Sequence, residues 1–129
     1  MRLQEALDKA DAQRTNMITR PEKIAWISEL DGLIWSEIVS KHNLLPGEEI
    51  RLSVMPEYDE DTEPGKKLLV PFPYDEVYTY WLMAKIDERH AEAERYNNDK
   101  LTFNGYYEQF SDWWTRNHMP KTNVREIML

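Results

Sequence analysis

The sequence predicts a mainly α protein: a small helical bundle built on a long antiparallel helix hairpin, with a non-helical excursion between its second and third helices. Two observations support this fold class. Apolar residues recur every three or four positions in four segments, at about 2–12, 20–41, 74–96 and 98–117. Residues 74–114 also carry 11 of the 15 aromatic side chains, so most of the core is expected there. At 129 residues, we expect a single domain, 1–129.

The first two helices begin with recognisable patterns. In 2–12, Leu3 and Leu7 share one face and charged residues occupy the other, which is typical of a short amphipathic helix. The sequence TRPE at 19–22 is a capping box with proline in the first turn, so the second helix is expected to run from about 20 to 41. Gly32 within it costs about 1 kcal/mol relative to alanine, and we expect a close neighbouring helix as the reason.

The third and fourth predicted helices form the hairpin. Pro73 suits the first turn of a helix, and Asp75 follows where a carboxylate meets the positive end of the helix dipole. The pair Asn97-Asn98 interrupts the apolar stripe, so we expect a tight turn there, with one bent helix as the alternative. The candidate core consists of inward-facing residues of the last three helices: Trp26, Leu30, Ile34, Ile38, Tyr78, Trp81, Leu82, Phe103 and Phe110.

The excursion, residues 42–73, lacks helical periodicity. Ile50, Leu52 and Val54 alternate with polar residues, as in a half-buried strand, and the apolar run 68–70 could pair with them as a β-hairpin. Non-helical segments of this length in small domains are usually functional or mobile. A tail, 119–129, follows the fourth helix and carries apolar residues that could dock elsewhere: Val124, Ile127, Met128 and Leu129.

An acidic tract forms the expected tip of the excursion. Five carboxylates fall within seven residues: Glu57, Asp59, Glu60, Asp61 and Glu63. Their order does not match the alternating ligands of a calcium loop. The tract is therefore either a solvated loop tip or a docking surface for a basic partner, and we take its five acids as candidate interface residues.

Composition argues against several functions. Cysteine is absent, which removes disulfides, thiolate nucleophiles and the usual structural zinc sites. The net charge of −8 argues against nucleic-acid binding, because displacing counterions from DNA requires Lys and Arg. No apolar run is long enough to span a membrane, so no membrane partner is expected. The N-terminal residues lack the apolar core of a signal peptide, which indicates an intracellular product.

No catalytic residue, metal ligand or cofactor is predicted, and we expect a protein that is not an enzyme. The best metal candidate is Asp87-x-x-His90 followed by Glu94, but carboxylate-bridged sites in bundles need such a motif twice, so a solvated helix face is favoured. Asp31 interrupts the apolar stripe of the second helix and needs a partner if buried. A structural contact with an arginine, an indole N–H or a helix end is favoured over a lone catalytic acid.

The adjacent pair Trp113-Trp114 exceeds what one helix face can bury, because neighbouring residues on a helix diverge by about 100°. At least one ring must face a second surface, covered either by the first two helices or by another subunit. We therefore include Trp113 and Trp114 among the candidate interface residues.

Three stretches resemble small proteins encoded among the morphogenesis genes of tailed phages and prophages of Gram-positive bacteria. They are EKIAWISELDGLIWSEI, LLVPFPYDEVYTYWLMAKID and RYNNDKLTFNGYYEQFSDWWTRNHMP, which lie within roughly residues 19–120. These proteins resemble head–tail connector (adaptor) proteins, mostly helical subunits that assemble in a ring beneath the portal. The resemblance implies a homo-oligomeric ring and partners among portal-like and tail-side virion proteins. It also implies the bacterial host cytoplasm during assembly, and then the virion neck, as the location.

Two functional hypotheses follow. The first is a structural virion assembly protein, a head–tail connector subunit that acts through oligomerisation. The alternative is a small non-enzymatic regulatory or interaction module, such as an assembly chaperone or a host-factor inhibitor, that docks through the acidic loop. An enzyme or metal-binding bundle around Asp87, His90 and Glu94 is disfavoured.

Overall fold

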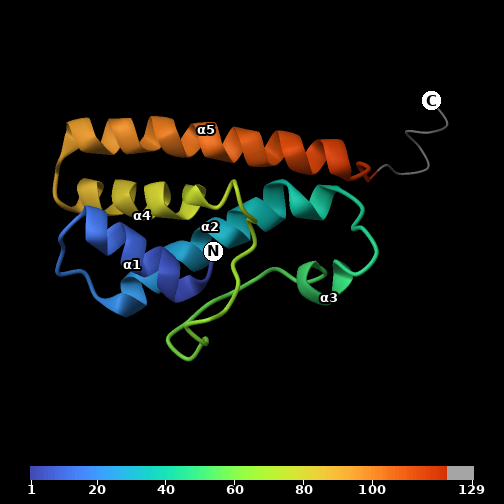
Figure 1. Cartoon of the computed structure of the whole chain (residues 1–129), viewed down its shortest axis with the longest axis horizontal. Helices are drawn as coiled ribbons and strands as arrows, with labels where there is room; N and C mark the ends of the chain where they lie inside the picture. The colour runs from blue at the N-terminus through green and yellow to red at the C-terminus, as the bar shows by residue number, and fades with distance from the viewer. Residues whose placement is uncertain (122–129) are drawn as a thin grey trace.

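The computed structural model describes residues 1–121 and confirms the mainly helical fold class. The helices are α1 (Leu3–Gln13), α2 (Arg20–Glu37), α3 (Glu49–Leu52), α4 (Glu76–Arg89) and α5 (Ala93–Asn117), with a 3₁₀ helix η1 (Val39–Lys41) after α2. Helix α4 is central, because it contacts α5 on one side and α1 and α2 on the other (Figure 1). Within residues 1–121, no helix combines the length and apolarity that crossing a membrane requires.

Most of the predicted core is buried. The buried members are Leu30, Ile34, Ile38, Tyr78, Leu82, Phe103 and Phe110. Trp26 and Trp81 are only partly buried, because they lie at the rim of the core. The indole N–H of Trp81 donates to the carbonyl oxygen of Trp26 at 2.8 Å, and the cations of Lys85 and Arg89 lie over the two rings. The rim position thus gives the Trp81 N–H an acceptor and places a cation over each of the two rings.

Helices α1 and α2 begin close to their predicted positions, and a cap marks the start of α2. The Glu22 N–H donates to Oγ1 of Thr19 at 3.4 Å, and Pro21 occupies the first turn of α2. At the other end, α2 stops earlier than residue 41, because Ile38 leaves the helix and the next three residues form η1. Near Gly32, the neighbour is not a helix: a Cβ there would lie 3.6 Å from the sulfur of Met55.

The turn between α4 and α5 lies at residues 90–92, not at Asn97-Asn98. Ala91 has a positive φ of 58°, and its N–H donates to the carbonyl of Glu88 at 3.1 Å. The Glu92 N–H donates to the carbonyl of Asp87 at 2.9 Å, which completes a Schellman motif. The two asparagines are exposed inside α5, where each costs only a fraction of a kcal/mol relative to alanine.

The β-hairpin interpretation of the excursion is wrong. Residues 1–121 contain no β-strand, and the segment expected as the first strand contains helix α3, with Ile50 87% exposed and Leu52 buried. We call residues 49–58 the first leg of the excursion and residues 64–70 its second leg. The second leg pairs with the N-terminal residues: the Leu3 N–H donates to the Lys66 carbonyl at 2.8 Å. An isolated bridge between Arg2 and residue 67 extends this pairing. The backbone N–H and C=O groups of the second leg that a hairpin would need are therefore bonded to the N-terminal residues.

The described part of the tail returns to the end of α2. The Asn43 N–H donates to the Met119 carbonyl at 2.7 Å, and the Lys121 N–H donates to the Lys41 carbonyl at 2.9 Å. These bonds fix the end of α5 against η1. The apolar tail residues predicted to dock, at 124 and 127–129, lie outside the described residues.

Candidate functional site

Asp31 ties the excursion to the helices. Its carboxylate is fully buried on α2. Oδ1 accepts a hydrogen bond of 2.6 Å from the Tyr78 hydroxyl on α4, and Oδ2 accepts one of 2.6 Å from the Tyr58 hydroxyl. Oδ2 also accepts the Leu69 N–H at 3.1 Å, and the Tyr78 oxygen accepts the Val70 N–H at 2.7 Å. The partners are thus two tyrosines and a backbone amide, in place of the arginine, indole or helix end that we expected.

The electrostatics of this cluster favour a structural role. Burial raises the pKa of Asp31, while the hydrogen bonds from Tyr58, Tyr78 and Leu69 lower it. Burial, followed by the nearby Asp31 charge, raises the pKa of both tyrosines above the ordinary value. The phenols therefore remain protonated donors near neutral pH. This arrangement suits an anchor that holds both legs of the excursion, and it does not activate a nucleophile.

The acidic tract forms an ordered turn beyond this anchor. The Asp59 N–H donates to Oγ1 of Thr62 at 2.9 Å, and the Asp61 N–H donates to Oδ1 of Asp59 at 2.8 Å. Figure 1 shows this green turn projecting away from the helices. We call residues 57–63 the acidic tip. All five predicted interface acids in it are exposed, and none forms an ion pair with another residue in 1–121.

A cleft with basic walls lies between the two legs of the excursion. A cavity of about 360 Å³ is lined by Arg51 of α3 and by Lys66 and Lys67 of the second leg. A second cavity of about 310 Å³ shares Arg51 and Lys67 and adds Arg2. Leu69 contributes to both cavities. We call the surface formed by Arg2, Arg51, Lys66 and Lys67 the basic cleft.

Two of these cations are held in place by the backbone of the second leg. Nη1 of Arg2 donates to the Gly65 carbonyl at 2.7 Å, and Nη2 of Arg51 donates to the Leu68 carbonyl at 3.1 Å. Within residues 1–121, none of the four cleft cations forms an ion pair. Carbonyl oxygens do not neutralise these charges, and the cavities have four cations against the carboxylates of Glu5 and Glu57, so the cleft carries a net positive charge.

The two adjacent tryptophans differ in burial within the chain. Trp114 is 3% exposed, so it does not offer the interface that we expected. Its ring stacks on His118 at a centroid distance of 3.6 Å, and Phe110 lies 5.8 Å away. Trp113 is partly buried against Tyr74, at 5.6 Å, in the segment that precedes α4. The prediction of an interface is therefore wrong for Trp114, whereas the partly exposed face of Trp113 leaves it a prediction.

The residues of the disfavoured metal motif do not converge. Asp87 is 1% exposed and accepts hydrogen bonds of 3.1 Å from Nε of Arg14. His90 follows the last residue of α4, whereas Glu94 is exposed in the first turn of α5. The turn at 90–92 thus separates side chains that a continuous helix would have aligned. In the described part of the chain, no three His, Asp or Glu side chains are arranged to hold a metal ion.

Arg14 joins two buried carboxylates that the sequence did not reveal as a pair. Its Nη2 lies 3.3 Å from Oδ1 of Asp99, in addition to its bonds with Asp87. Burial, and then a hydrogen bond with Asp87, raise the pKa of Asp99 to about 7, while the Arg14 charge lowers it. The cluster fastens the end of α1 to both α4 and α5.

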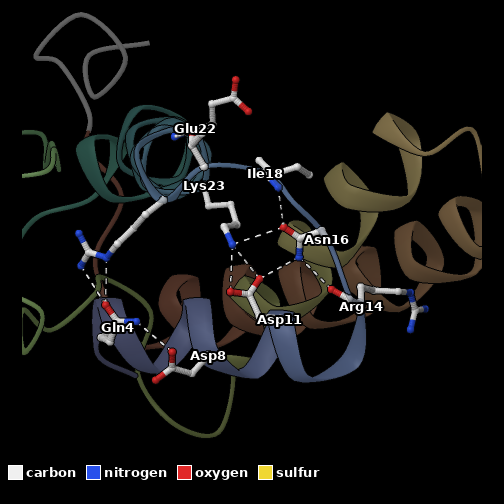
Figure 2. A network of polar contacts seen from close by, with 10 residues as sticks. Gln4, Asp8, Asp11, Arg14, Asn16, Ile18, Glu22 and Lys23 are labelled. Carbon is white, nitrogen blue, oxygen red and sulfur yellow. Dashed lines mark hydrogen bonds and ion pairs between the residues drawn. The ribbon is translucent and has the colours of Figure 1, made fainter.

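A second polar network fixes α2 against α1, and Figure 2 shows its members at close range. The ammonium group of Lys23 lies 2.9 Å from both carboxylate oxygens of Asp11 and 3.4 Å from Oδ1 of Asn16. Asn16 also accepts the Ile18 N–H at 3.1 Å. Lys23 is 7% exposed, and this compensation allows its charge to be buried. The network therefore positions α2, and with it Asp31, and has a structural role.

Sequence reasoning found the acidic tip and missed the basic cleft. One signal was available: the charge reverses from the acids at 57–63 to Lys66-Lys67 within the same excursion. Arg2 and Arg51 carried no such signal, because only the pairing of the second leg with the N-terminal residues brings them together.

A scan against protein-family models found no match, and searches of curated proteins and of solved structures found no significant match.

Proposed function

We propose that this chain is a structural subunit of a tailed-phage particle, a head–tail connector that acts by forming a ring. The observation that carries the proposal is the anchored acidic tip, an exposed and ordered projection whose charges have no ion-pair partner within residues 1–121. The sequence resemblance of roughly residues 19–120 to small phage morphogenesis proteins supports the same role.

A ring requires two different patches on each subunit, because its interface is heterologous. The excursion, together with Arg2, supplies two such patches of opposite charge, the acidic tip and the basic cleft. In this proposal, portal-like and tail-side virion proteins flank the ring, and the virion neck is its final location. The net charge of −8 suits a channel through which DNA slides without binding.

The second candidate function is a small interaction module that docks a basic partner through the acidic tip. The ordered turn at Asp59 favours it, because a preorganised loop loses little conformational entropy on binding. Such a module would remain monomeric or dimeric and would form a tight complex with its partner.

Mass measurement by light scattering over a wide concentration range, with negative-stain images of the heaviest species, separates the two. Closed rings support the connector. A monomer at every concentration that binds tightly to a basic partner supports the interaction module. A monomer that forms rings only when a portal protein is added supports a connector whose partner templates its assembly.

A further inference from the structure

We propose that the basic cleft of one copy binds the acidic tip of a second copy. This inference rests on the proposed function and names the surfaces that meet in the assembly. Its basis is the placement of Arg2, Arg51, Lys66 and Lys67 around two adjoining cavities, in a chain whose net charge is −8.

The charges of the two surfaces are complementary. The cavities of the cleft present four cations against two carboxylates, those of Glu5 and Glu57. The tip presents four further acids beyond Glu57, all of them exposed: Asp59, Glu60, Asp61 and Glu63. Arg51 is directed by its bond to the Leu68 carbonyl, so part of the positive charge is in position before a ligand arrives.

The occupant comes from another copy because, of the five tip acids, only Glu57 lines the cleft of its own chain, and the turn at 59–63 is fixed by its own hydrogen bonds. Tyr58 is fixed to Asp31 immediately before the turn, and the Asp59 carboxylate is engaged by the Asp61 N–H. The Lys66 N–H donates to the Glu63 carbonyl at 3.0 Å, which closes the other side of the turn. No acid at 59–63 forms an ion pair with a cleft cation in the described structure.

Charge reversal tests the pairing. The tip variant is Glu60→Lys with Asp61→Lys, and the cleft variant is Lys66→Glu with Lys67→Glu. None of these four side chains makes a hydrogen bond within residues 1–121, so folding is expected to survive. Asp59, Arg2 and Arg51 are left in place because each holds the backbone.

Each variant alone should raise the concentration needed for assembly at least tenfold. The chain that carries all four substitutions should recover assembly, because positions 60–61 and 66–67 again carry opposite charges and its net charge is unchanged. An equimolar mixture of the tip variant and the cleft variant should also assemble. Glu108→Lys with Asp112→Lys, on the exposed face of α5, is the matched control for the tip variant and should leave assembly unchanged.

Contact is tested directly by zero-length carbodiimide cross-linking of a mixture of ¹⁴N and ¹⁵N protein, read by mass spectrometry. Mixed-isotope links between Lys66 or Lys67 and the acids at 59–63 support the inference, because only contact between copies produces them. Assembly whose mixed links lie elsewhere, or which the four-substitution chain fails to restore, overturns the inference and leaves the ring-forming function intact. Absence of both assembly and mixed links, with or without a portal protein, overturns both proposals.

Discussion

The hydroxyl oxygen of Tyr78 lies 2.6 Å from Oδ1 of Asp31 and at the same time accepts the Val70 N–H at 2.7 Å. One phenol therefore joins α2, α4 and the second leg of the excursion. Both its donor and an acceptor position are used in a fully buried environment. Loss of either partner would leave a buried polar group unsatisfied, which costs more than the net gain of the hydrogen bond itself.

Replacing Asp31 by alanine should lower the free energy of unfolding by about 3–5 kcal/mol, because the hydroxyls of Tyr58 and Tyr78 would lose their acceptor. Tyr58→Phe should cost about 1–2 kcal/mol, since it removes one donor from the carboxylate. Urea unfolding followed by circular dichroism measures both. Tyr80→Phe is the matched control, because Tyr80 is partly buried and stacks on Tyr106 without a hydrogen bond from its hydroxyl within residues 1–121. An unchanged stability for Asp31→Ala would show that the anchor is not formed.

Asp99 should make the stability of the fold fall as the pH rises from about 4 to about 7. Its pKa is about 7 in the folded chain, above the ordinary value of 3.8. Between these values the folded chain binds a proton that the unfolded chain has released, so the contribution of this group is complete below pH 3.8 and lost as the pH passes 7. The buried Oδ2 of Asp99 has no hydrogen-bond partner within residues 1–121, and a proton there would let it donate to the Asp87 carboxylate.

The test is urea unfolding of the wild type and of Asp99→Asn between pH 4 and pH 8. The asparagine cannot titrate, so its stability should change less across this range. Asp112→Asn, an exposed substitution on the same helix, should follow the wild-type curve. Parallel curves for the wild type and Asp99→Asn would show that the carboxyl is already ionised at pH 5.

The sequence was informative where the periodicity was helical and where caps were conventional. Thr19 and Pro21 led to the start of α2, and Phe110 and Leu82 were correctly assigned to the core. The turn before α5 was missed because an alanine, and not a glycine or asparagine, adopts the left-handed conformation there. The bonds that form the turn, from Ala91 to Glu88 and from Glu92 to Asp87, are local, but no glycine or asparagine marks them in the sequence, whereas Asn97-Asn98 lies within α5.

In the excursion, by contrast, the local sequence pattern did not predict the structure. Alternation at Ile50, Leu52 and Val54 has the period of a strand, yet a single turn of helix forms around Leu52 and leaves Ile50 in solvent. Nothing local indicates that Tyr58 reaches Asp31 or that Arg2 lies beside Lys67, because these contacts join residues far apart in the chain. The acidic tip could be predicted from composition, whereas the cleft that complements it required the fold.

Phe110→Ala should lower the free energy of unfolding by about 3–5 kcal/mol. Phe110 is 1% exposed, and its ring centroid lies 6.4 Å from that of Tyr74 and 5.8 Å from that of Trp114. Its removal therefore leaves a cavity among aromatic side chains. Leu101→Ala, at a site that is 71% exposed on the same helix, should change stability by less than about 0.5 kcal/mol. Thermal and urea unfolding of both variants provide the measurement, and equal stabilities would place Phe110 outside the core.

Neutralising the outer acids of the tip should leave the fold intact. Glu60→Gln with Asp61→Asn should change the free energy of unfolding by less than about 0.5 kcal/mol, as exposed substitutions usually do. Asp59→Ala should cost about 1 kcal/mol, because its carboxylate accepts the Asp61 N–H within the turn. Urea unfolding of both variants at low and high salt separates the loss of surface charge, which salt screens, from the loss of the hydrogen bond within the turn. A large loss from the Glu60 and Asp61 pair would mean that these side chains are buried or bind an ion.

Gly32→Ala should stabilise the chain by up to about 1 kcal/mol, which is the helix-propensity difference between the two residues. The new Cβ would meet the sulfur of Met55 at 3.6 Å, an ordinary contact with a flexible side chain, so no strain offsets the gain. Gly105→Ala is the matched comparison, because it lies mid-helix in α5 with nothing within 4 Å of the new Cβ. If only Gly105→Ala stabilises, then Met55 packs on α2 more tightly than this distance indicates, and the glycine is retained for that contact. If both stabilise equally, Gly32 is not needed for folding, and the segment that carries the acidic tip rests on α2 without requiring a missing side chain.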